Sequence, residues 1–149
     1  MDFTHLDKEG NVKMVDITKK EISKRIAIAK GIIKLQKETI EKIVNGNIKK
    51  GNVLTTAKIA GIMAAKNSFN IIPLCHQIQL TGIDINFNIL EEEIEIESVI
   101  TAIDKTGAEM EALTSVSVAA LTIYDMCKAI DKNMVIKEIK LCHKSKQSV

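Results

Sequence analysis

The sequence predicts an α+β domain in which an antiparallel sheet carries its helices on one face, as in ferredoxin-like folds. Apolar and polar residues alternate strictly along residues 82–89 and alternate again along 94–100, and three glutamates lie between these segments. Such alternation is typical of strands with one buried face, so the two segments are expected to form a hairpin. Two longer segments rich in small and apolar residues, 52–69 and 109–130, are expected as helices. The expected element order is β-β-α-α-β-β-α-β.

Weaker patterns complete this order. The run at residues 25–35 is rich in β-branched residues, which favours a strand. Asn52 is a residue type that caps helix N-termini, and Pro73 ends the helix that follows it. The remaining expected elements are a short strand at residues 12–17, a short helix at 39–44 closed by Asn45 and Gly46, and a last strand at 134–141.

The chain of 149 residues has the length of one domain, and 46% of it is hydrophobic. It contains no internal repeat and no Pro/Gly-rich linker, so residues 1–149 are expected to form a single domain. A short tail from about residue 144 is a candidate mobile segment. Because aromatic residues make up only 3% of the chain, the core must consist mainly of Ile, Val, Leu, Ala and Met.

Charge and composition argue against several partners. The net charge of +2 and the few aromatic residues argue against a nucleic-acid-binding surface. We find neither a signal peptide nor an apolar run long enough to span a bilayer, so no membrane partner is expected. With three cysteines in such a chain, the cytoplasm is the expected location.

Arg25 is the only arginine among 21 basic residues. A chain that uses lysine almost everywhere would keep one arginine where a planar, bidentate donor is needed, as in a phosphate or carboxylate contact. A side-chain stem packed along the surface explains it equally well. The sequence leaves both explanations open.

The segment from residue 109 to 128 carries most of the candidate chemistry. Asp125 and Lys128 lie three positions apart and therefore share one face of a helix that is otherwise largely apolar. A charged pair on a buried helix often marks a site, although an ordinary ion pair near a helix end explains the spacing as well. Glu109 and Glu111 suit the first turn, where the helix dipole favours acidic residues.

Two further candidates lie in loops. His76 follows Cys75 in a loop fixed by the only proline, where an imidazole can act as an acid, a base or a phosphate ligand. Lys50 precedes the helix capped by Asn52, where an anion would be favoured, although a solvated turn is the simpler explanation. The adjacent Cys-His pairs do not have zinc-site spacing, and no Walker-type loop is present. We therefore expect neither a metal nor another cofactor.

Five strings, taken together, resemble one family. They are Lys-Gly-Asn-Val at residues 50–53, Thr-Ala-Lys-Ile-Ala-Gly-Ile-Met-Ala-Ala-Lys at 56–66, Ile-Pro-Leu-Cys-His at 72–76, Lys-Thr-Gly-Ala-Glu-Met-Glu-Ala-Leu-Thr at 105–114 and Leu-Thr-Ile-Tyr-Asp-Met-Cys-Lys-Ala at 121–129. They closely resemble the cyclic pyranopterin monophosphate synthases, the family of molybdenum cofactor biosynthesis protein C. The similarity runs from Thr4 to Lys144.

The resemblance implies a lyase that converts 3′,8-cyclo-7,8-dihydro-GTP into cyclic pyranopterin monophosphate and releases pyrophosphate. It also implies a homo-hexamer, built as a trimer of dimers, with sites at subunit boundaries. By position, the resemblance assigns catalysis to Asp125, Lys128 and Lys50, and binding of this nucleotide-derived substrate to Leu74, Cys75, His76, Met110, Glu111, Glu109, Arg25, Lys66 and Lys144.

One departure and two rival functions stay open. The family commonly ends in a Lys-Ser-Gly-Gly-Lys-Ser string, but residues 144–148 here lack both glycines, so Lys146 does not align and the role of the tail is undecided. A purine-nucleotide or pterin cyclohydrolase-like enzyme would use similar lysines but would usually need a metal. A non-catalytic nucleotide-binding module is the second rival, and retention of both Asp125 and Lys128 argues against it.

Overall fold

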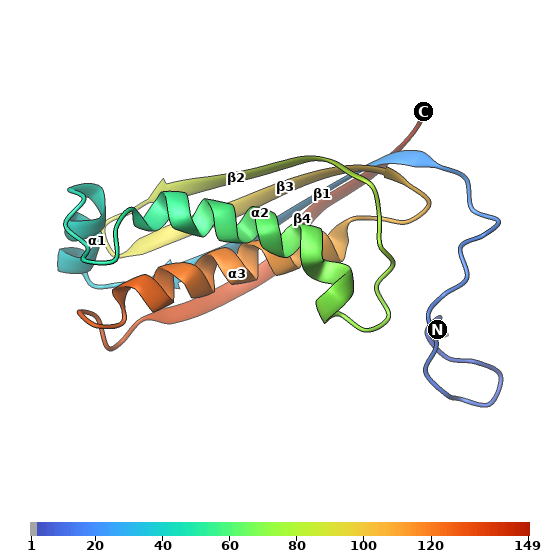
Figure 1. Cartoon of the computed structure of the whole chain (residues 1–149), viewed down its shortest axis with the longest axis horizontal. Coiled ribbons are helices and arrows are strands. Elements are labelled where there is room, and N and C mark those ends of the chain that lie inside the picture. The colour runs from blue at the N-terminus through green and yellow to red at the C-terminus, as the bar shows by residue number, and fades with distance from the viewer. Residues whose placement is uncertain (1–2) are drawn as a thin grey trace.

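The computed structural model describes residues 3–149. A long N-terminal arm precedes a sheet and three helices (Figure 1). In chain order the elements are β1 (Ser23–Lys34), α1 (Lys37–Val44), α2 (Val53–Ile71), β2 (Leu80–Ile89), β3 (Glu93–Asp104), α3 (Glu109–Cys127) and β4 (Val135–Ser148).

The four strands form one antiparallel sheet in the order β2-β3-β1-β4. The two central strands, β1 and β3, therefore come from distant parts of the chain. The helices α2 and α3 lie side by side over one face of this sheet (Figure 1). This arrangement confirms the predicted α+β class with its ferredoxin-like layering.

Alternation along the strands separates a core face from an outer face. On β3, Ile94, Ile96 and Ile100 are fully buried, and they lie on the same face of the sheet as the helices. The helix α3 supplies Val116 and Ile123, which are also fully buried. The core is thus built from aliphatic side chains, as the scarcity of aromatic residues predicted.

Small residues allow α2 and α3 to approach each other closely. A Cβ atom added to Gly61 of α2 would lie 3.1 Å from the backbone oxygen of Ser115 and would collide with the Ile85 side chain. The hydroxyl of Ser115 is buried and forms a 2.9 Å hydrogen bond with the hydroxyl of Ser98. At the N-terminal end of α2, the Asn52 side chain accepts a hydrogen bond of 3.0 Å from Thr55 N, which confirms the predicted N-cap.

The strand predicted at residues 12–17 is wrong. Val12 forms only an isolated bridge with Leu6, and residues 13–17 have no regular structure. These residues belong to the arm, which extends away from the sheet (Figure 1), so they have no neighbouring strand with which to pair. A short run rich in apolar residues does not form a strand where no such partner is available.

The other predicted elements are present with shifted ends. The helix predicted to reach residue 130 ends at Cys127, and β4 continues to Ser148 instead of stopping near residue 141. The tail from residue 144 therefore runs along β1, where Lys144 faces Ala27 and Lys146 faces Arg25 in the register.

Candidate functional site

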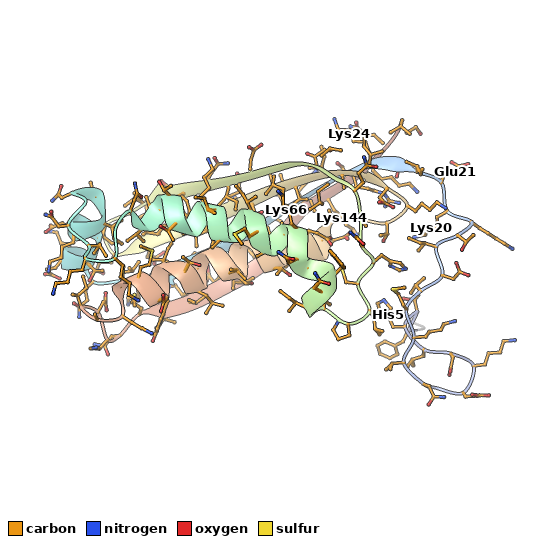
Figure 2. All side chains as sticks on the ribbon, in the orientation of Figure 1. His5, Lys20, Glu21, Lys24, Lys66 and Lys144 are labelled. Carbon is orange, nitrogen blue, oxygen red and sulfur yellow. The ribbon has the colours of Figure 1, made fainter. Side chains whose placement is uncertain are left out.

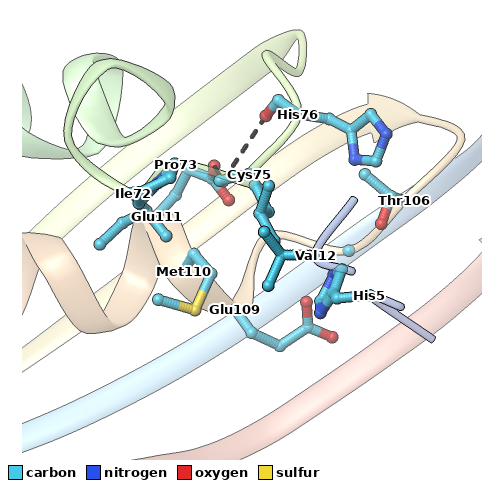
Figure 3. A pocket seen from close by; sticks show the side chains of 12 residues that line it. His5, Val12, Ile72, Pro73, Cys75, His76, Thr106, Glu109, Met110 and Glu111 are labelled. Carbon is cyan, nitrogen blue, oxygen red and sulfur yellow. Dashed lines mark hydrogen bonds between the residues drawn. The ribbon is translucent and has the colours of Figure 1, made fainter. Parts of the chain in front are cut away.

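A cavity of about 610 Å³ lies at the N-terminal end of α3. It brings together six of the residues assigned to the substrate, from the loop after α2 and from the first turn of α3 (Figure 3). The complete lining is His5, Val12, Ile72, Pro73, Leu74, Cys75, His76, Thr106, Gly107, Glu109, Met110 and Glu111. Apolar walls with a few convergent polar groups are characteristic of sites for small organic ligands.

Cys75 and Glu111 form the buried polar corner of this cavity. The Cys75 thiol lies 3.5 Å from Glu111 Oε2, and Glu111 is only 3% exposed. Burial raises the pKa of Glu111 above its ordinary value. Burial, with the neighbouring carboxylate of Glu111, raises the pKa of Cys75 to about 11. The thiol is therefore protonated at neutral pH and serves as a hydrogen-bond donor. It is not a strong nucleophile, because that role requires the thiolate.

His76 connects the cavity to the N-terminal arm. Its Nε2 lies 2.6 Å from the backbone oxygen of Val15. Because a carbonyl oxygen can only accept, Nε2 carries the proton, and in the neutral imidazole Nδ1 is the acceptor. His76 thus holds the arm with one ring nitrogen and keeps the other for a proton or for a ligand.

A second cavity of about 270 Å³ adjoins the first, because Gly107 and Glu109 line both. It is lined by Arg25, Lys144 and Lys146 from β1 and β4, together with Ile26, Ala108 and Ser145. Three cations thus meet around one hollow, where they are suited to binding an anionic group such as a phosphate.

The guanidinium of Arg25 is only partly used by hydrogen bonds to the protein. One of its terminal nitrogens, Nη2, lies 3.3 Å from the backbone oxygen of Lys105. Its Nε is buried and has no hydrogen-bond partner among residues 3–149. Lys144 Nζ lies 3.8 Å from Glu109 Oε1, so the carboxylate shared by the two cavities is partly compensated. A buried donor without a partner is costly, but because Nε is not exposed to the cavity, it does not by itself indicate a ligand there.

Asp125, Lys128 and Lys50 form a third cluster. Lys128 Nζ lies 3.1 Å from Asp125 Oδ1, and Lys50 Nζ lies 3.4 Å from Asp125 Oδ2 and 3.0 Å from the Asp125 backbone oxygen. Hydrogen bonds from Lys128 and Lys50 lower the pKa of Asp125 below its ordinary value of 3.8. The carboxylate is therefore ionised at neutral pH, and the three side chains are exposed to solvent.

The third cluster lies far from the two cavities in a single chain. Glu109 begins α3 and Asp125 lies near its end, which at about 1.5 Å per residue separates them by about 24 Å. Lys66 lines neither cavity: it is exposed on α2, in the half of that helix nearer the arm (Figure 2). One chain thus unites Arg25 and Lys144 with the six residues of the first cavity but not with Asp125.

The structure adds lining residues that the sequence did not single out. His5, Val12 and Thr106 line the first cavity, and Lys146 lines the second. His5 is one of only three histidines in the chain, which was the available signal. Nothing local in the sequence could indicate Lys146, because its place beside Arg25 depends on the register between β4 and β1.

Two structural features bear on the wider classes of function. Within residues 3–149, no group of three or more histidine, cysteine, aspartate or glutamate side chains is arranged to hold a metal ion. No helix in this part of the chain is long and apolar enough to cross a membrane.

Comparison with known proteins places the chain in a family. A model of the MoaC family matches residues 14–147. Proteins named cyclic pyranopterin monophosphate synthase from Desulfitobacterium hafniense and Thermoanaerobacter pseudethanolicus are each 54% identical over 97% of this chain, which covers 90% and 93% of their own lengths. A protein of the same name from Clostridium perfringens is 55% identical over 95% of this chain and 91% of its own length. This chain therefore belongs to the MoaC family.

Proposed function

We infer that this protein is a cyclic pyranopterin monophosphate synthase, a lyase of molybdenum cofactor biosynthesis. The observation that carries this function is the identity of 54% with proteins of that name over almost the whole chain. The proposed reaction takes 3′,8-cyclo-7,8-dihydro-GTP, rebuilds its purine as a pterin, closes a cyclic phosphate and releases pyrophosphate.

The first cavity suits the base of this substrate. Its apolar walls, which include Ile72, Leu74 and Met110, can cover the faces of a fused ring, and the carboxylates of Glu109 and Glu111 can accept hydrogen bonds from ring N–H and amino groups. The thiol of Cys75 and the free nitrogen of His76 complete a polar edge. Opening one ring and closing another requires repeated proton transfers, for which His76 is suitably placed.

The second cavity suits the triphosphate. Departure of pyrophosphate leaves negative charge on the leaving group, and fixed cations stabilise that charge in the transition state. Arg25, Lys144 and Lys146 supply three positive charges beside the cavity proposed for the base. We propose that the tail serves here, with Lys146 on β4 in place of the glycine-containing string that it lacks.

We propose that the catalytic cluster reaches the substrate from a neighbouring subunit. The separation of about 24 Å along α3 is too large for Asp125 to act on a ligand held by Glu109 of the same chain. A two-fold symmetric pair solves this problem, since each chain can offer its cavities to one site and its Asp125, Lys128 and Lys50 to the other. The proposed assembly is a homo-hexamer made of three such dimers, with residues 1–149 acting as one catalytic domain.

The cytoplasm is the proposed location, and the three free cysteines support it. Small-molecule chemistry of this type needs no nucleic acid and no membrane. We also propose that the reaction uses no cofactor.

The proposed function is tested by incubating the purified protein with enzymatically prepared 3′,8-cyclo-7,8-dihydro-GTP. We expect cyclic pyranopterin monophosphate and pyrophosphate in equal amounts, detected by mass spectrometry and by a coupled pyrophosphate assay. Turnover should survive treatment with a chelator followed by removal of the chelator. No product from a folded protein would contradict the function, and turnover that needs an added transition metal would favour a cyclohydrolase-like enzyme.

A site shared between chains predicts complementation. Glu111→Gln and Asp125→Asn oligomers should each be inactive, but after dissociation and random reassembly the mixture should recover about a quarter of wild-type activity, because half of the dimers are mixed and each mixed dimer has one intact site. The matched control is Asp125→Asn mixed with Lys128→Ala, in which every site carries a damaged cluster, so no recovery is expected.

Recovery in the control mixture, or none in the test mixture despite proven exchange, would contradict a shared site. Sedimentation velocity supplies the assembly size, which should be six times the 16.5 kDa chain mass.

Replacing Arg25 by lysine tests the role proposed for the only arginine. The change keeps the charge but removes the planar fork of donors, so the Michaelis constant for the substrate should rise about tenfold. Steady-state kinetics give the measurement. Lys30→Ala is the control, because Lys30 lies on the same strand but pairs with Glu97 on the outer face of the sheet. A Michaelis constant equal to that of the wild type would remove Arg25 from the site.

A further inference from the structure

The N-terminal arm contains a compact hairpin, residues 5–13. Leu6 and Val12 form an antiparallel bridge, and Lys13 N donates a 2.8 Å hydrogen bond to the backbone oxygen of His5. The turn is held by Asp7, whose Oδ1 accepts hydrogen bonds from Glu9 N and Asn11 N at 2.9 and 2.8 Å. These contacts are local, so the shape of the hairpin is set largely by its own residues.

Two hydrogen bonds between distant segments fix the chain after the hairpin to the rest of the protein. His76 Nε2 binds the backbone oxygen of Val15, and Lys105 Nζ donates a 2.9 Å hydrogen bond to the backbone oxygen of Thr18. His76 is itself a lining residue of the first cavity, and Lys105 precedes its lining residue Thr106. The arm is thus attached at the rim of this cavity.

The hairpin closes one side of the first cavity with two side chains, those of His5 and Val12. Figure 3 shows the His5 imidazole beside the carboxylate of Glu109 and near Thr106, away from Ile72 and Pro73. Because Glu109 also lines the second cavity, His5 lies on the side where the two cavities adjoin. This is the position expected for a group that contacts the part of a nucleotide between its base and its phosphates.

The imidazole of His5 is not needed to build the hairpin. The hydrogen bond at this residue uses its backbone oxygen, and within residues 3–149 its side chain has no hydrogen-bond partner. The ring is exposed and directed into the cavity (Figure 3). A polar side chain held in a ligand cavity by a preformed turn, yet unused by the fold, is available to a ligand.

We propose that His5 is a substrate-binding residue, and that the hairpin of residues 5–13 is a preformed wall of the site. The imidazole donates a hydrogen bond to the sugar-phosphate part of the nucleotide-derived substrate, and Val12 covers the adjacent apolar surface. This inference rests on the proposed function for the identity of the substrate. It assigns to the arm a role that none of the sequence motifs indicated.

The kinetic test compares two changes in the hairpin with a matched control. His5→Gln removes the imidazole but keeps the turn, and Asp7→Ala keeps the imidazole but removes the turn contacts. Both should raise the Michaelis constant about tenfold with a smaller change in kcat, as loss of a ligand hydrogen bond or of its positioning predicts. His143→Gln should match wild type, because His143 is exposed on β4 and pairs in register with Ile28, outside both cavities.

The outcomes separate this inference from the proposed function. Absence of turnover by the wild-type protein would count against the function itself. With an active wild type, unchanged Michaelis constants for His5→Gln would overturn the inference. A defect in Asp7→Ala alone would also overturn it, because the hairpin would then act without the imidazole.

A second measurement does not depend on turnover. The chain has only three histidines, so its ring carbons can be followed individually by NMR after isotope labelling. On addition of substrate to the Asp125→Asn protein, the His5 and His76 resonances should shift and the His143 resonance should not. A stationary His5 resonance alongside a shifted His76 resonance would show that the substrate binds without reaching the hairpin, and would overturn the proposal.

Discussion

Replacement of Asp125 by asparagine is expected to reduce product formation by about 10²–10⁴-fold while the protein stays folded. An amide has nearly the same shape as a carboxylate but cannot accept or return a proton at neutral pH. The two lysines that contact Asp125 hold its pKa below 3.8, so the wild-type group starts the reaction as an ionised base. Lys128→Ala should cause a loss of similar size, because it removes the closer of the two cations.

The measurement is single-turnover product formation with each variant, with thermal melting followed in parallel. Asp125 and both lysines are largely exposed, so the melting temperature should stay close to that of the wild type. The control is Glu91→Gln. This change disrupts a similarly exposed ion pair, with Lys37 at 3.3 Å, that lies outside both cavities and outside the cluster of Asp125. Near wild-type turnover by Asp125→Asn or Lys128→Ala would refute the catalytic role of this cluster.

The pH profile gives an independent check on the same group. Because the pKa of Asp125 is lowered, its ionised form persists as the pH falls through the range where an ordinary carboxyl group begins to take up protons. In the free enzyme, kcat/KM should therefore show no acid limb from Asp125 above about pH 4. An acid limb that disappears in Asp125→Asn, with its midpoint well above 4, would contradict this charge state.

Replacement of Asp131 by alanine is expected to destabilise the protein by about 2–4 kcal/mol. Asp131 is 2% exposed, and its carboxylate joins the start of α1 to the turn after α3. Its Oδ2 accepts hydrogen bonds from Gln36 N at 2.8 Å and from Thr39 Oγ1 at 2.9 Å, and its Oδ1 accepts one from Asn133 N at 3.3 Å. Alanine would leave the buried Thr39 hydroxyl and two part-buried backbone N–H groups without this partner.

Urea denaturation at matched protein concentration gives the measurement, because an oligomer's stability depends on concentration. Asp84→Ala is the control: Asp84 is exposed on β2, and its removal should change the unfolding free energy by less than about 0.5 kcal/mol. A change of that small size for Asp131→Ala would contradict the role assigned to this carboxylate. Asp131 also lines a hollow with Tyr124 and Lys128, so we expect its loss to disturb the proposed catalytic cluster.

The split between cavities and cluster accounts for the composition of α3. The charged residues of α3 lie only near its ends, with Glu109 and Glu111 at one end and Asp125 at the other. Between them the helix packs on the sheet and on α2 with residues such as Val116 and Ala119, which are fully buried. The largely apolar middle of the segment thus follows from its place in the fold.

Local patterns were sufficient to predict the secondary structure and the residue types of the site. Alternation in β2 and β3, the Asn52 cap and the long apolar run of α3 each depend on neighbours in the chain, so the sequence alone determined them. The strings around Cys75, Glu111 and Asp125 likewise identified the family. The exception is the strand predicted at residues 12–17: its apolar residues suggested a strand, but a strand also needs a partner strand.

Only the tertiary structure decided which of these residues meet. Strand register brought Lys146 beside Arg25, and hydrogen bonds from His76 and Lys105 hold the arm so that His5 and Cys75 line the same cavity. The rigid length of α3 then placed Asp125 away from both cavities, although Glu109 and Asp125 belong to one continuous motif-rich segment. The sequence alone indicates which residue types are available at the candidate site, whereas helix rise and sheet register set the distances between them.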